Sequence, residues 1–584
     1  MQFDEREYEL VEKILLGDSK FNELQREYIE LFETKTIVAG PGAGKTTALA
    51  AKIVLLLKYL NKIGSKDGVC IITYTNVAVT EINMTLQKAG IASLSHPHFI
   101  GTIHEFFNKY CVTPYFKKEY KNNVLIFDNE HKDDTEFYKS FISRKLPWIN
   151  ADKFERFRDS FPHKIYNSKL VINDIQGEIN IENTTNWDKF DKYKNLMLEA
   201  KIKRKMQGVL THDDTFLFSK MYLSNPIYVE MLRNRFKYIF IDEFQDTTPV
   251  GIELLRGIFD FEGNCLQMIG DPYQTIMYGQ PMPMVDESQV FRLNISNRFG
   301  PQISKPLNVI MPEANIHTSD NKNSFAPVLL IYNDEKSIYT AYKEIIKEYE
   351  QQENTFQTCI MSDKVLVLER KWASIIKEGA EYNKKKSKKL ETIANQLKRL
   401  VIEFICKRIK NDNETLTELK KWINKHQNIM VLNKILLDFL KFGIAEEKKQ
   451  RLRGFINDLL MEKGERCINI NNEIFREIED IFVNSNIREE SEPESIDDIF
   501  TIHSVKGETL RSALVVNFND GPLTDILLHR YSILEDAHYQ YTDCNLLYVA
   551  ISRVAYLLVF AIHKDVCTDD VREKLNDDWV IREI

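Results

Sequence analysis

A glycine-rich loop that ends in a lysine and two threonines is the first chemical feature of this sequence. It follows a strand-like run at 35–38 and precedes a stretch at 48–60 that is typical of a helix. Glycines allow backbone N–H groups to close around phosphate oxygens, and a helix N-terminus adds positive potential. We therefore expect Lys45 to neutralise the terminal phosphates of a nucleotide and Thr46 to ligate Mg²⁺. The residues expected to contact the nucleotide here are Ala39, Gly40, Pro41, Gly42, Ala43, Gly44, Lys45, Thr46 and Thr47.

An acidic pair after a second apolar run supplies the other half of such a site. Residues 238–241 are aromatic or aliphatic, and Asp242 and Glu243 follow them directly. A buried strand delivers such side chains to its C-terminal end, where parallel α/β sheets bind ligands. We expect Asp242 to hold Mg²⁺, mostly through water, and Glu243 to polarise the attacking water. The plainer alternatives are an ordinary glycine-rich turn and an exposed acidic turn, and the pairing of the two motifs argues against both.

The elements that position these residues belong to a long chain of ordinary globular composition. With 584 residues, 43% of them hydrophobic and 28% charged, the chain is expected to form about three to five domains. The net charge of −8 excludes a basic surface over the whole molecule. No apolar run approaches the ~18 residues of a membrane span, and no basic leader opens the sequence, so we expect no membrane and a cytoplasmic location. The eight cysteines form no Cys-x-x-Cys pair, which argues against zinc and iron–sulfur sites.

The order of the segments indicates α/β ends and a helical middle. Strand-like runs alternate with amphipathic stretches near both ends of the chain, which favours parallel α/β domains. Residues 338–487 are rich in Lys, Glu, Leu and Ile and contain no proline, so this middle part is expected to be helical.

The acidic run Asp-Glu-Phe-Gln-Asp at 242–246 is more specific than a generic nucleotide site. Together with other segments it resembles the UvrD/Rep-like branch of superfamily-1 DNA helicases. The resemblance covers both ends of the chain, and its motifs follow one another in the order that this family uses. The segments that carry it are Phe21–Gln25, Tyr74–Ala78, Gly101–Phe106, Leu210–Asp214, Ile269–Gln274, Leu293–Arg298, Thr501–Glu508 and Leu547–Arg553.

This resemblance implies an α/β fold of two RecA-like P-loop motor domains with parallel sheets, each carrying a mostly helical insertion. In that arrangement the nucleotide, ATP with Mg²⁺, lies between the two motor domains. The expected boundaries are 1–104 and 211–290 for the first motor domain, 105–210 for its insertion, 291–340 and 490–584 for the second motor domain, and 341–489 for its Lys-rich insertion.

The resemblance also assigns residues at the nucleotide. Gln25 would pair with adenine, Gln274 would sense the γ-phosphate, and Glu508 would contact the nucleotide. Arg298 and Arg553 would come from the second motor domain and stabilise the charge that develops on the γ-phosphate during hydrolysis. An arginine finger typically contributes about 10³–10⁵ in rate. Arg553 follows the run at 546–550, which we interpret as strand-like. The expected catalytic set is therefore Lys45, Glu243, Gln274, Arg298 and Arg553.

DNA contacts are expected from aromatic platforms and from polar groups that hold backbone phosphates. A base stacked on an aromatic ring contributes roughly 1–3 kcal/mol whatever its identity, so we expect tolerance of DNA sequence. The run at 384–389, which contains five lysines, is either a solvated helix face or loop, or a docking face for duplex DNA or a partner. The residues expected to contact DNA are Tyr74, Thr75, Asn76, Thr102, His104, Tyr278 and His503.

Departures from the family pattern favour ATPase activity over processive unwinding. Met277 and Gly279 stand where the family has a tyrosine and a second aromatic residue. Asn297 stands where a tyrosine stacks on adenine, so ATP selectivity depends more heavily on Gln25. Glu508 stands one residue earlier than the family's acid, and the second insertion is short.

The leading hypothesis is a DNA-dependent ATPase and helicase that moves 3′→5′ on single-stranded or partly duplex DNA. Compact proteins with these departures resemble the helicase subunit of Gabija-type anti-phage systems, which implies a separate OLD-like nuclease subunit as partner. The alternative is an ATP- and DNA-sensing subunit that switches this nuclease with little unwinding of its own. A P-loop enzyme without DNA, such as a nucleotide kinase, would leave Gln274, Arg298 and Arg553 unexplained.

Overall fold

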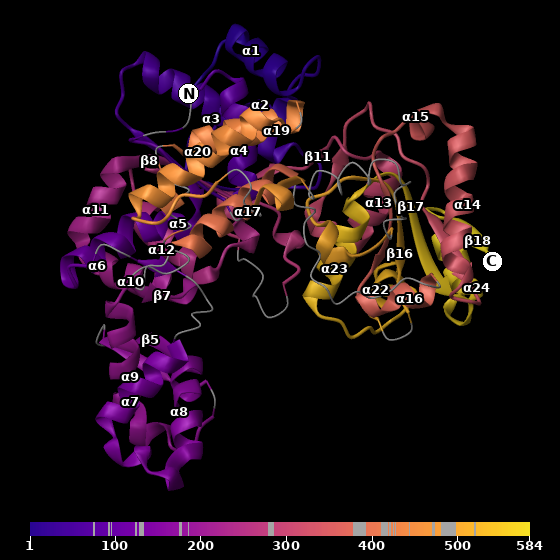
Figure 1. Cartoon of the computed structure of the whole chain (residues 1–584). Coiled ribbons are helices and arrows are strands. Elements are labelled where there is room, and N and C mark those ends of the chain that lie inside the picture. Colours follow the sequence, from indigo (N-terminus) through magenta and orange to yellow (C-terminus); the bar gives the residue numbers. More distant parts are fainter. Residues whose placement is uncertain are drawn as a thin grey trace. The chain divides into compact units, whose positions relative to one another are not determined.

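The computed structural model of the chain divides into two compact units (Figure 1). The first comprises Met1–Ile376 and Ile499–Ile584, and the second comprises Lys377–Asp498. Outside the described residues lie Tyr74, Thr75, Tyr278, Gly279 and the lysine run at 384–389. The described residues are 1–73, 76–91, 94, 96–122, 125–127, 134–173, 178–184, 186–277, 285–377, 393–409, 419, 422–423, 426, 428–442, 444–469, 474–479, 498–518 and 521–584.

The first sheet of the first unit is parallel throughout. Its strand order is β10–β1–β9–β8–β2–β3, so β9 lies between β1 and β8. Because parallel strands end at the same edge, the glycine-rich loop after β1 and the acidic pair after β8 meet there. The strands are β1 (Lys35–Ala39), β2 (Gly68–Thr73), β3 (Phe99–Thr102), β8 (Phe236–Asp242), β9 (Cys265–Gly270) and β10 (Val290–Leu293).

Alternate residues of these strands belong to two different cores. On β8, Phe240 joins one apolar cluster, whereas its neighbours Ile239 and Ile241 join another. Both faces of the sheet are therefore buried, which explains why β2 is buried along its whole length. The helices of this part include α1 (Glu5–Leu15), α2 (Glu23–Glu30), α3 (Lys45–Lys62), α4 (Asn76–Lys88), α5 (Ile103–Phe107), α10 (His212–Leu223), α11 (Pro226–Arg235) and α12 (Pro249–Phe259).

The second sheet is also parallel, with the order β15–β14–β16–β17–β13–β18. Here too, Val515 and its neighbour Leu514 belong to cores on opposite faces. The predicted α/β fold with two parallel sheets is thus confirmed. The strands are β13 (Val328–Tyr332), β14 (Asp363–Val367), β15 (Ile499–Thr501), β16 (Leu510–Val516), β17 (Val554–His563) and β18 (Val580–Glu583). The helices of this part include α13 (Pro301–Ile310), α14 (Ser337–Gln352), α15 (Asn354–Gln357), α16 (Ala373–Ile376), α22 (Leu523–Arg530), α23 (Tyr541–Ser552) and α24 (Asp569–Leu575).

Helix α23 corrects one interpretation of the sequence. The run at 546–550 is not a strand: it lies inside α23, and β17 begins only at Val554. Every residue from Thr542 to Ser552 is buried, so this helix has no polar face from which its periodicity could be recognised. A short apolar run buried on all sides is compatible with a helix or a strand.

The segment at 113–210 is mostly helical. Helices α7, α8 and α9 pack together around a cluster that includes Tyr138, Phe161 and Met197 (Figure 1). Strands β5 and β6 form an antiparallel pair. The elements of this segment are α6 (Thr113–Glu119), β4 (Ile126–Phe127), α7 (Asp134–Lys145), α8 (Glu155–Asn167), β5 (Lys169–Asn173), β6 (Glu178–Glu182), α9 (Phe190–Met206) and β7 (Val209–Leu210).

The described part of the second unit is mostly helical, with α17 (Ile393–Arg408), α19 (Ile429–Phe442) and α20 (Glu446–Glu462) around one apolar core. It begins at Lys377, later than the start at 341 expected for the Lys-rich insertion. The difference arises because β14 pairs with β15 and β16 in the second sheet. Among the described residues, no helix combines the length and apolar character that a bilayer crossing requires.

Candidate active site

The glycine-rich loop joins the end of β1 to the start of α3. Gly42 and Gly44 adopt φ values of 75° and 74°, a backbone region that other residues rarely adopt. A Cβ at Gly42 would lie 2.6 Å from Cβ of Arg298, and a Cβ at Gly44 would lie 2.6 Å from Nε2 of Gln25. Both positions therefore favour glycine for conformation, and Gly42 requires it for space as well, whereas a Cβ at Gly44 would displace the Gln25 side chain. The N-terminal N–H groups of α3, which no helical carbonyl can satisfy, are consequently available to a phosphate.

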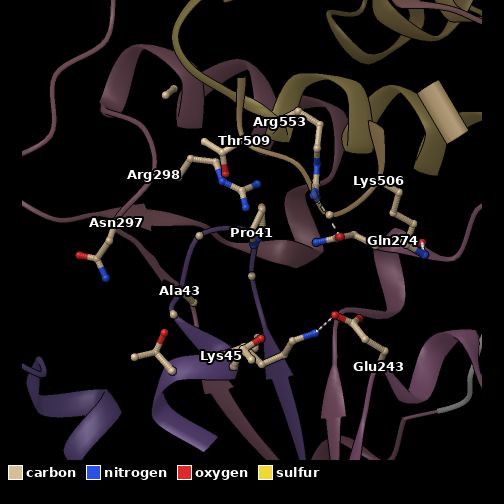
Figure 2. Close-up of a pocket in the computed structure, with 18 of the residues that line it drawn as sticks. Pro41, Ala43, Lys45, Glu243, Gln274, Asn297, Arg298, Lys506, Thr509 and Arg553 are labelled. Atoms are coloured by element: carbon tan, nitrogen blue, oxygen red, sulfur yellow. Dashed lines mark hydrogen bonds and ion pairs between the residues drawn. The ribbon is translucent and has the colours of Figure 1, made fainter. Parts of the chain in front are cut away.

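Lys45, the first residue of α3, reaches the acidic pair at the end of β8 (Figure 2). Its Nζ forms an ion pair with Glu243 and lies 3.5 Å from Oδ1 of Asp242. Asp242 is 2% exposed, and its Oδ1 accepts a hydrogen bond of 3.0 Å from the backbone N–H of Glu243. Glu243 adopts a φ of 52°, which is uncommon for any residue except glycine. Backbone strain of this kind concentrates at functional sites.

The three charges shift one another's pKa values. Burial raises the pKa of Asp242 to about 6, although Lys45 opposes this shift. Burial acts in the same direction on Glu243, but the Lys45 ammonium outweighs it and holds the pKa of Glu243 below its usual value. For Lys45, burial disfavours the charge, and the two carboxylates more than compensate, so its pKa is raised. Glu243 is therefore ionised near neutral pH, as a base that orients water must be.

Asp271, directly after β9, anchors a chain of hydrogen bonds. Its carboxylate accepts from the Tyr273 backbone N–H (3.1 Å), from Nε2 of Gln274 (2.8 Å) and from the Tyr548 hydroxyl (3.2 Å). Burial raises the pKa of Asp271 to about 6 in spite of these donors. Oε1 of Gln274 in turn accepts from Nη2 of Arg553 at 2.9 Å. These hydrogen bonds therefore connect Asp271 through Gln274 to the guanidinium of Arg553, which follows α23.

Arg298 lies close to Arg553, after the short strand β11 (Ile295–Ser296). Its Nη1 donates to the Ser552 carbonyl at 2.7 Å. Burial lowers the pKa of Arg298 to about 9, and the Arg553 charge adds to the shift. Burial also lowers the pKa of Arg553, against the carboxylates of Asp271 and Glu243. A buried and a half-buried cation this close together favour an anionic ligand.

A cavity of about 840 Å³ lies between the glycine-rich loop and these arginines. Figure 2 shows Arg298 and Arg553 in the upper part of the view and Lys45 with Glu243 in the lower part, with Gln274 beside Arg553. The volume of this cavity is in the range of sites that hold small molecules and cofactors. Of the predicted site residues, those that line the cavity are Ala39, Gly40, Pro41, Gly42, Ala43, Gly44, Lys45, Thr46, Thr47, Glu243, Gln274, Arg298 and Arg553.

Lys506 is a cavity residue to which the sequence assigned no role. Its Nζ forms an ion pair of 2.6 Å with Asp246 and donates to the Gln274 carbonyl at 2.7 Å. Burial raises the pKa of Asp246, and Lys506 opposes the shift. The sequence did carry a signal that could have found Lys506, because this residue lies within the helicase-like motif at 501–508. Further lining residues that the sequence did not assign to the site include Lys322, Met361, Gly507, Thr509 and Ala555.

Two expected nucleotide contacts lie elsewhere. Gln25 is beside the loop, where its Nε2 donates to the Ala43 carbonyl at 2.8 Å. Glu508 does not line the cavity: its Oε2 accepts from Nζ of Lys364 on β14 at 2.5 Å. The structure therefore brings Gln25 to the edge of the site and engages Glu508 with another partner.

The described candidates for DNA contact do not line the cavity. Thr102 caps α5, and its Oγ1 accepts from the Glu105 backbone N–H at 3.3 Å. The His104 ring lies 5.2 Å from the ring of His212. Burial lowers the pKa of His104, and the nearby His212 lowers it further. Nε2 of His503 lies 3.1 Å from the Ile276 carbonyl. Asn76 is the first residue of α4.

The donor set fits Mg²⁺ only together with phosphate oxygens. Within the described part of the chain, no group of three or more His, Cys, Asp or Glu side chains is arranged to hold a metal ion. Mg²⁺ is commonly held by one or two carboxylates plus substrate phosphates. Thr46 lines the cavity, and Asp242 lies within reach of the Lys45 ammonium, so hard oxygen donors are present beside the phosphate loop.

Comparison with known proteins finds helicases. The "ATP-dependent DNA helicase Rep" of Buchnera aphidicola subsp. Baizongia pistaciae is 26% identical over 261 residues, which cover 44% of this chain and 36% of that protein. The "Probable DNA helicase II homolog" of Mycoplasma capricolum subsp. capricolum is 26% identical over 246 residues, which cover 41% of this chain and 32% of that protein. The chain thus spans about a third of the length of these relatives.

A longer match is weaker in identity. The "Probable DNA helicase II homolog" of Mycoplasma genitalium is 21% identical over an alignment of 614 positions, which covers 93% of this chain and 84% of that protein. The profile of the UvrD/REP helicase N-terminal domain matches residues 21–279. The segment that holds Lys45, Glu243 and Gln274 is therefore similar to the N-terminal domain of UvrD/REP helicases.

Proposed function

We propose that this chain is an ATP-dependent DNA helicase, a motor that hydrolyses ATP while it moves 3′→5′ on single-stranded or partly duplex DNA. The observation that carries the proposal is the shared cavity. Lys45 and Glu243 reach it from the first sheet, and Arg553 reaches it from the turn between α23 and β17 of the second sheet. Because the cations of this site come from both sheets, its geometry depends on the distance between the two sheets. Hydrolysis is therefore coupled to motion of one sheet relative to the other. The proposed location is the cytoplasm, where both substrates are found.

Each side chain at the cavity has a role that its contacts support. Lys45 and the N-terminal end of α3 hold the β- and γ-phosphates, and Glu243 orients the attacking water. Arg298 and Arg553 stabilise the charge that develops on the γ-phosphoryl oxygens. Mg²⁺, held by Thr46 and Asp242, would supply further neutralisation of phosphate charge. Gln25, beside Ala43, pairs with the adenine.

Three hydrogen bonds give the proposed γ-phosphate sensor a link to the proposed DNA contacts. Lys506 donates to the Gln274 carbonyl at 2.7 Å, Nδ2 of Asn545 donates to the Thr275 carbonyl at 2.8 Å, and His503 lies 3.1 Å from the Ile276 carbonyl. All three end on consecutive residues that begin with the sensor itself. A change at the γ-phosphate therefore has a short path to His503, which we expect to hold a DNA phosphate.

The proposal is tested by ATP turnover measured with and without single-stranded DNA. We expect DNA to raise turnover, and Lys45→Ala and Glu243→Gln to abolish it. Lys62→Ala, which changes an exposed lysine at the other end of α3, is the matched control. Strand displacement on duplexes with a 3′ or a 5′ single-stranded tail tests the direction. Turnover that ignores DNA would refute the proposal, and unwinding from 5′ tails alone would refute the direction.

A second candidate is an ATP- and DNA-sensing subunit of an anti-phage system that switches a separate OLD-like nuclease. The departures at Met277 and Asn297 favour it, since Met277 is 46% exposed and Asn297 lines the cavity where the family places a stacking tyrosine. This candidate predicts DNA-stimulated turnover with little strand displacement. It also predicts that the product of the adjacent gene co-purifies with the chain and cuts DNA in response to ATP. Strong unwinding by the chain alone would favour the first candidate.

A further inference from the structure

Lys52 is a buried lysine that the proposed mechanism does not use. It is 0% exposed in α3, two helical turns after Lys45. Its Nζ donates to the backbone carbonyls of Tyr28, at 2.7 Å, and Leu31. It also lies 4.3 Å from the centroid of the Tyr28 ring. Among the described residues no carboxylate pairs with it, and burying a cation in this way is costly. The compensation for this cost must therefore come from the two carbonyls and the aromatic ring that Lys52 contacts.

The two carbonyls belong to the end of α2. Tyr28 is in the last turn, and Leu31 is the residue that follows the helix. The Tyr28 carbonyl also accepts from the Leu31 backbone N–H at 3.2 Å, but a helix of eight residues is not stable without outside contacts. Nε2 of Gln267 on β9 donates to the same Leu31 carbonyl at 2.9 Å. Lys52 and Gln267 therefore fasten the C-terminal end of α2 to α3 and β9.

The other end of α2 carries Gln25. Its Oε1 accepts from the Asn22 backbone N–H at 3.0 Å, and its Nε2 donates to the Ala43 carbonyl at 2.8 Å. An amide has two N–H bonds and two oxygen lone pairs, so one donor and one acceptor are left over from these contacts. Adenine presents the complementary pair, an acceptor at N7 and a donor at N6, whereas guanine presents two acceptors at the same edge.

We infer that Lys52 is a positioning residue for nucleotide recognition: it ties α2 to the helix that begins at the phosphate loop, and α2 in turn presents Gln25 to the adenine. This inference rests on the proposed function, in which Gln25 faces the base. One helix thus serves both ends of the nucleotide, with Lys45 at the phosphates and Lys52 behind the base-reading helix.

The protonation state of Lys52 does not decide this role. Burial lowers the pKa of Lys52 to about 7. The neutral amine still has two N–H bonds, one for each of the two carbonyls that it contacts. Methionine has a similar length and no donor, so Lys52→Met removes both hydrogen bonds while it fills the same space.

The test is the affinity of the full chain for fluorescent analogues of ATP and GTP, measured by anisotropy without DNA. We expect the wild type to prefer the ATP analogue. Lys52→Met should weaken binding of the ATP analogue about tenfold, as the loss of about one well-placed hydrogen bond would. Binding of the GTP analogue should stay unchanged. Lys62→Met, on the exposed end of the same helix, should match the wild type.

A double variant separates positioning from a general loss of structure. Because Lys52 acts through Gln25, Lys52→Met combined with Gln25→Ala should bind the ATP analogue no more weakly than Gln25→Ala alone. The inference would be overturned if the double variant lost affinity by the product of the two single-variant factors. It would also be overturned if Lys52→Met kept the wild-type preference for the ATP analogue over the GTP analogue. If Lys52→Met does not fold, Gln267→Leu removes the other donor to Leu31 and gives the same comparison. A wild type that binds neither analogue would overturn the proposed function together with this inference.

Discussion

Arg553→Ala is expected to reduce ATP turnover by a large factor and to leave ATP binding nearly intact. The Arg553 side chain is 2% exposed and lines the cavity, and its Nη2 is held by Oε1 of Gln274 at 2.9 Å. In the proposed mechanism it contacts charge that is greatest in the transition state. The loss should therefore appear in kcat rather than in KM.

The magnitude follows from the second arginine. Arginine fingers contribute about 10³–10⁵ in rate, and we expect the lower end because Arg298 remains. Burial and the neighbouring Arg553 charge together lower the pKa of Arg298 to about 9. Removing Arg553 ends that repulsion and lets Arg298 compensate in part. A loss of about 10³ corresponds to ~4 kcal/mol of transition-state stabilisation.

The assay is phosphate release at saturating ATP and single-stranded DNA, with KM for ATP from the same series. Arg572→Ala is the control, since it removes an arginine that pairs with Glu583 at the surface, and it should behave as the wild type. Turnover of Arg553→Ala within threefold of the wild type would refute the reasoning. A large rise in KM at unchanged kcat would refute it as well.

Three further predictions concern the loop, a buried acid and the second unit. Gly44→Ala should weaken binding of a fluorescent ATP analogue, because its Cβ would lie 2.6 Å from Nε2 of Gln25 and would displace this side chain from its contact with the Ala43 carbonyl. Gly64→Ala, at a φ of 66° with no atom within 4 Å, should bind the analogue normally. Burial raises the pKa of Asp271 from 3.8 to about 6, so its contribution to stability is present below pH 4 and lost as the pH rises through 6. We therefore expect the free energy of unfolding of Asp271→Asn, measured in urea at pH 4 and pH 7, to rise relative to that of the wild type by up to ~3 kcal/mol between the two pH values. An equal change in the free energy of unfolding of both proteins would contradict this. Leu459→Ala should destabilise the second unit by about 2–5 kcal/mol in calorimetry, because the side chain is fully buried, while Met461→Ala, at an exposed position, should not.

The parts of the site that the sequence predicted are those whose geometry is local. The glycine-rich loop, Lys45 and the acidic pair depend on strand ends and a helix start, and each of these is visible in a few consecutive residues. The strand at 236–242 and the helix that begins at Lys45 follow from such runs. The position of Arg553 at the cavity was expected from a resemblance, and the structure brings it there from α23.

Contacts between distant segments were not predictable. The ion pair of Lys506 with Asp246 joins residues 260 positions apart, and no local pattern announces it. The partner of Glu508 is Lys364 on β14, a strand that composition had assigned to the helical insertion. Helix α23 was misinterpreted because a segment buried on every side carries no periodic signal.

The carboxamide of Gln274 has a direction that follows from its two neighbours. Its nitrogen donates to Asp271 at 2.8 Å, and its oxygen accepts from Arg553 at 2.9 Å. Only a side chain that both donates and accepts a hydrogen bond fits here, since glutamate would repel Asp271 and lysine would repel Arg553. In the proposed mechanism, a phosphate that drew the guanidinium toward itself would release the oxygen and leave the nitrogen bound to Asp271. The Gln274 side chain would then be free to rotate about its remaining contact with Asp271.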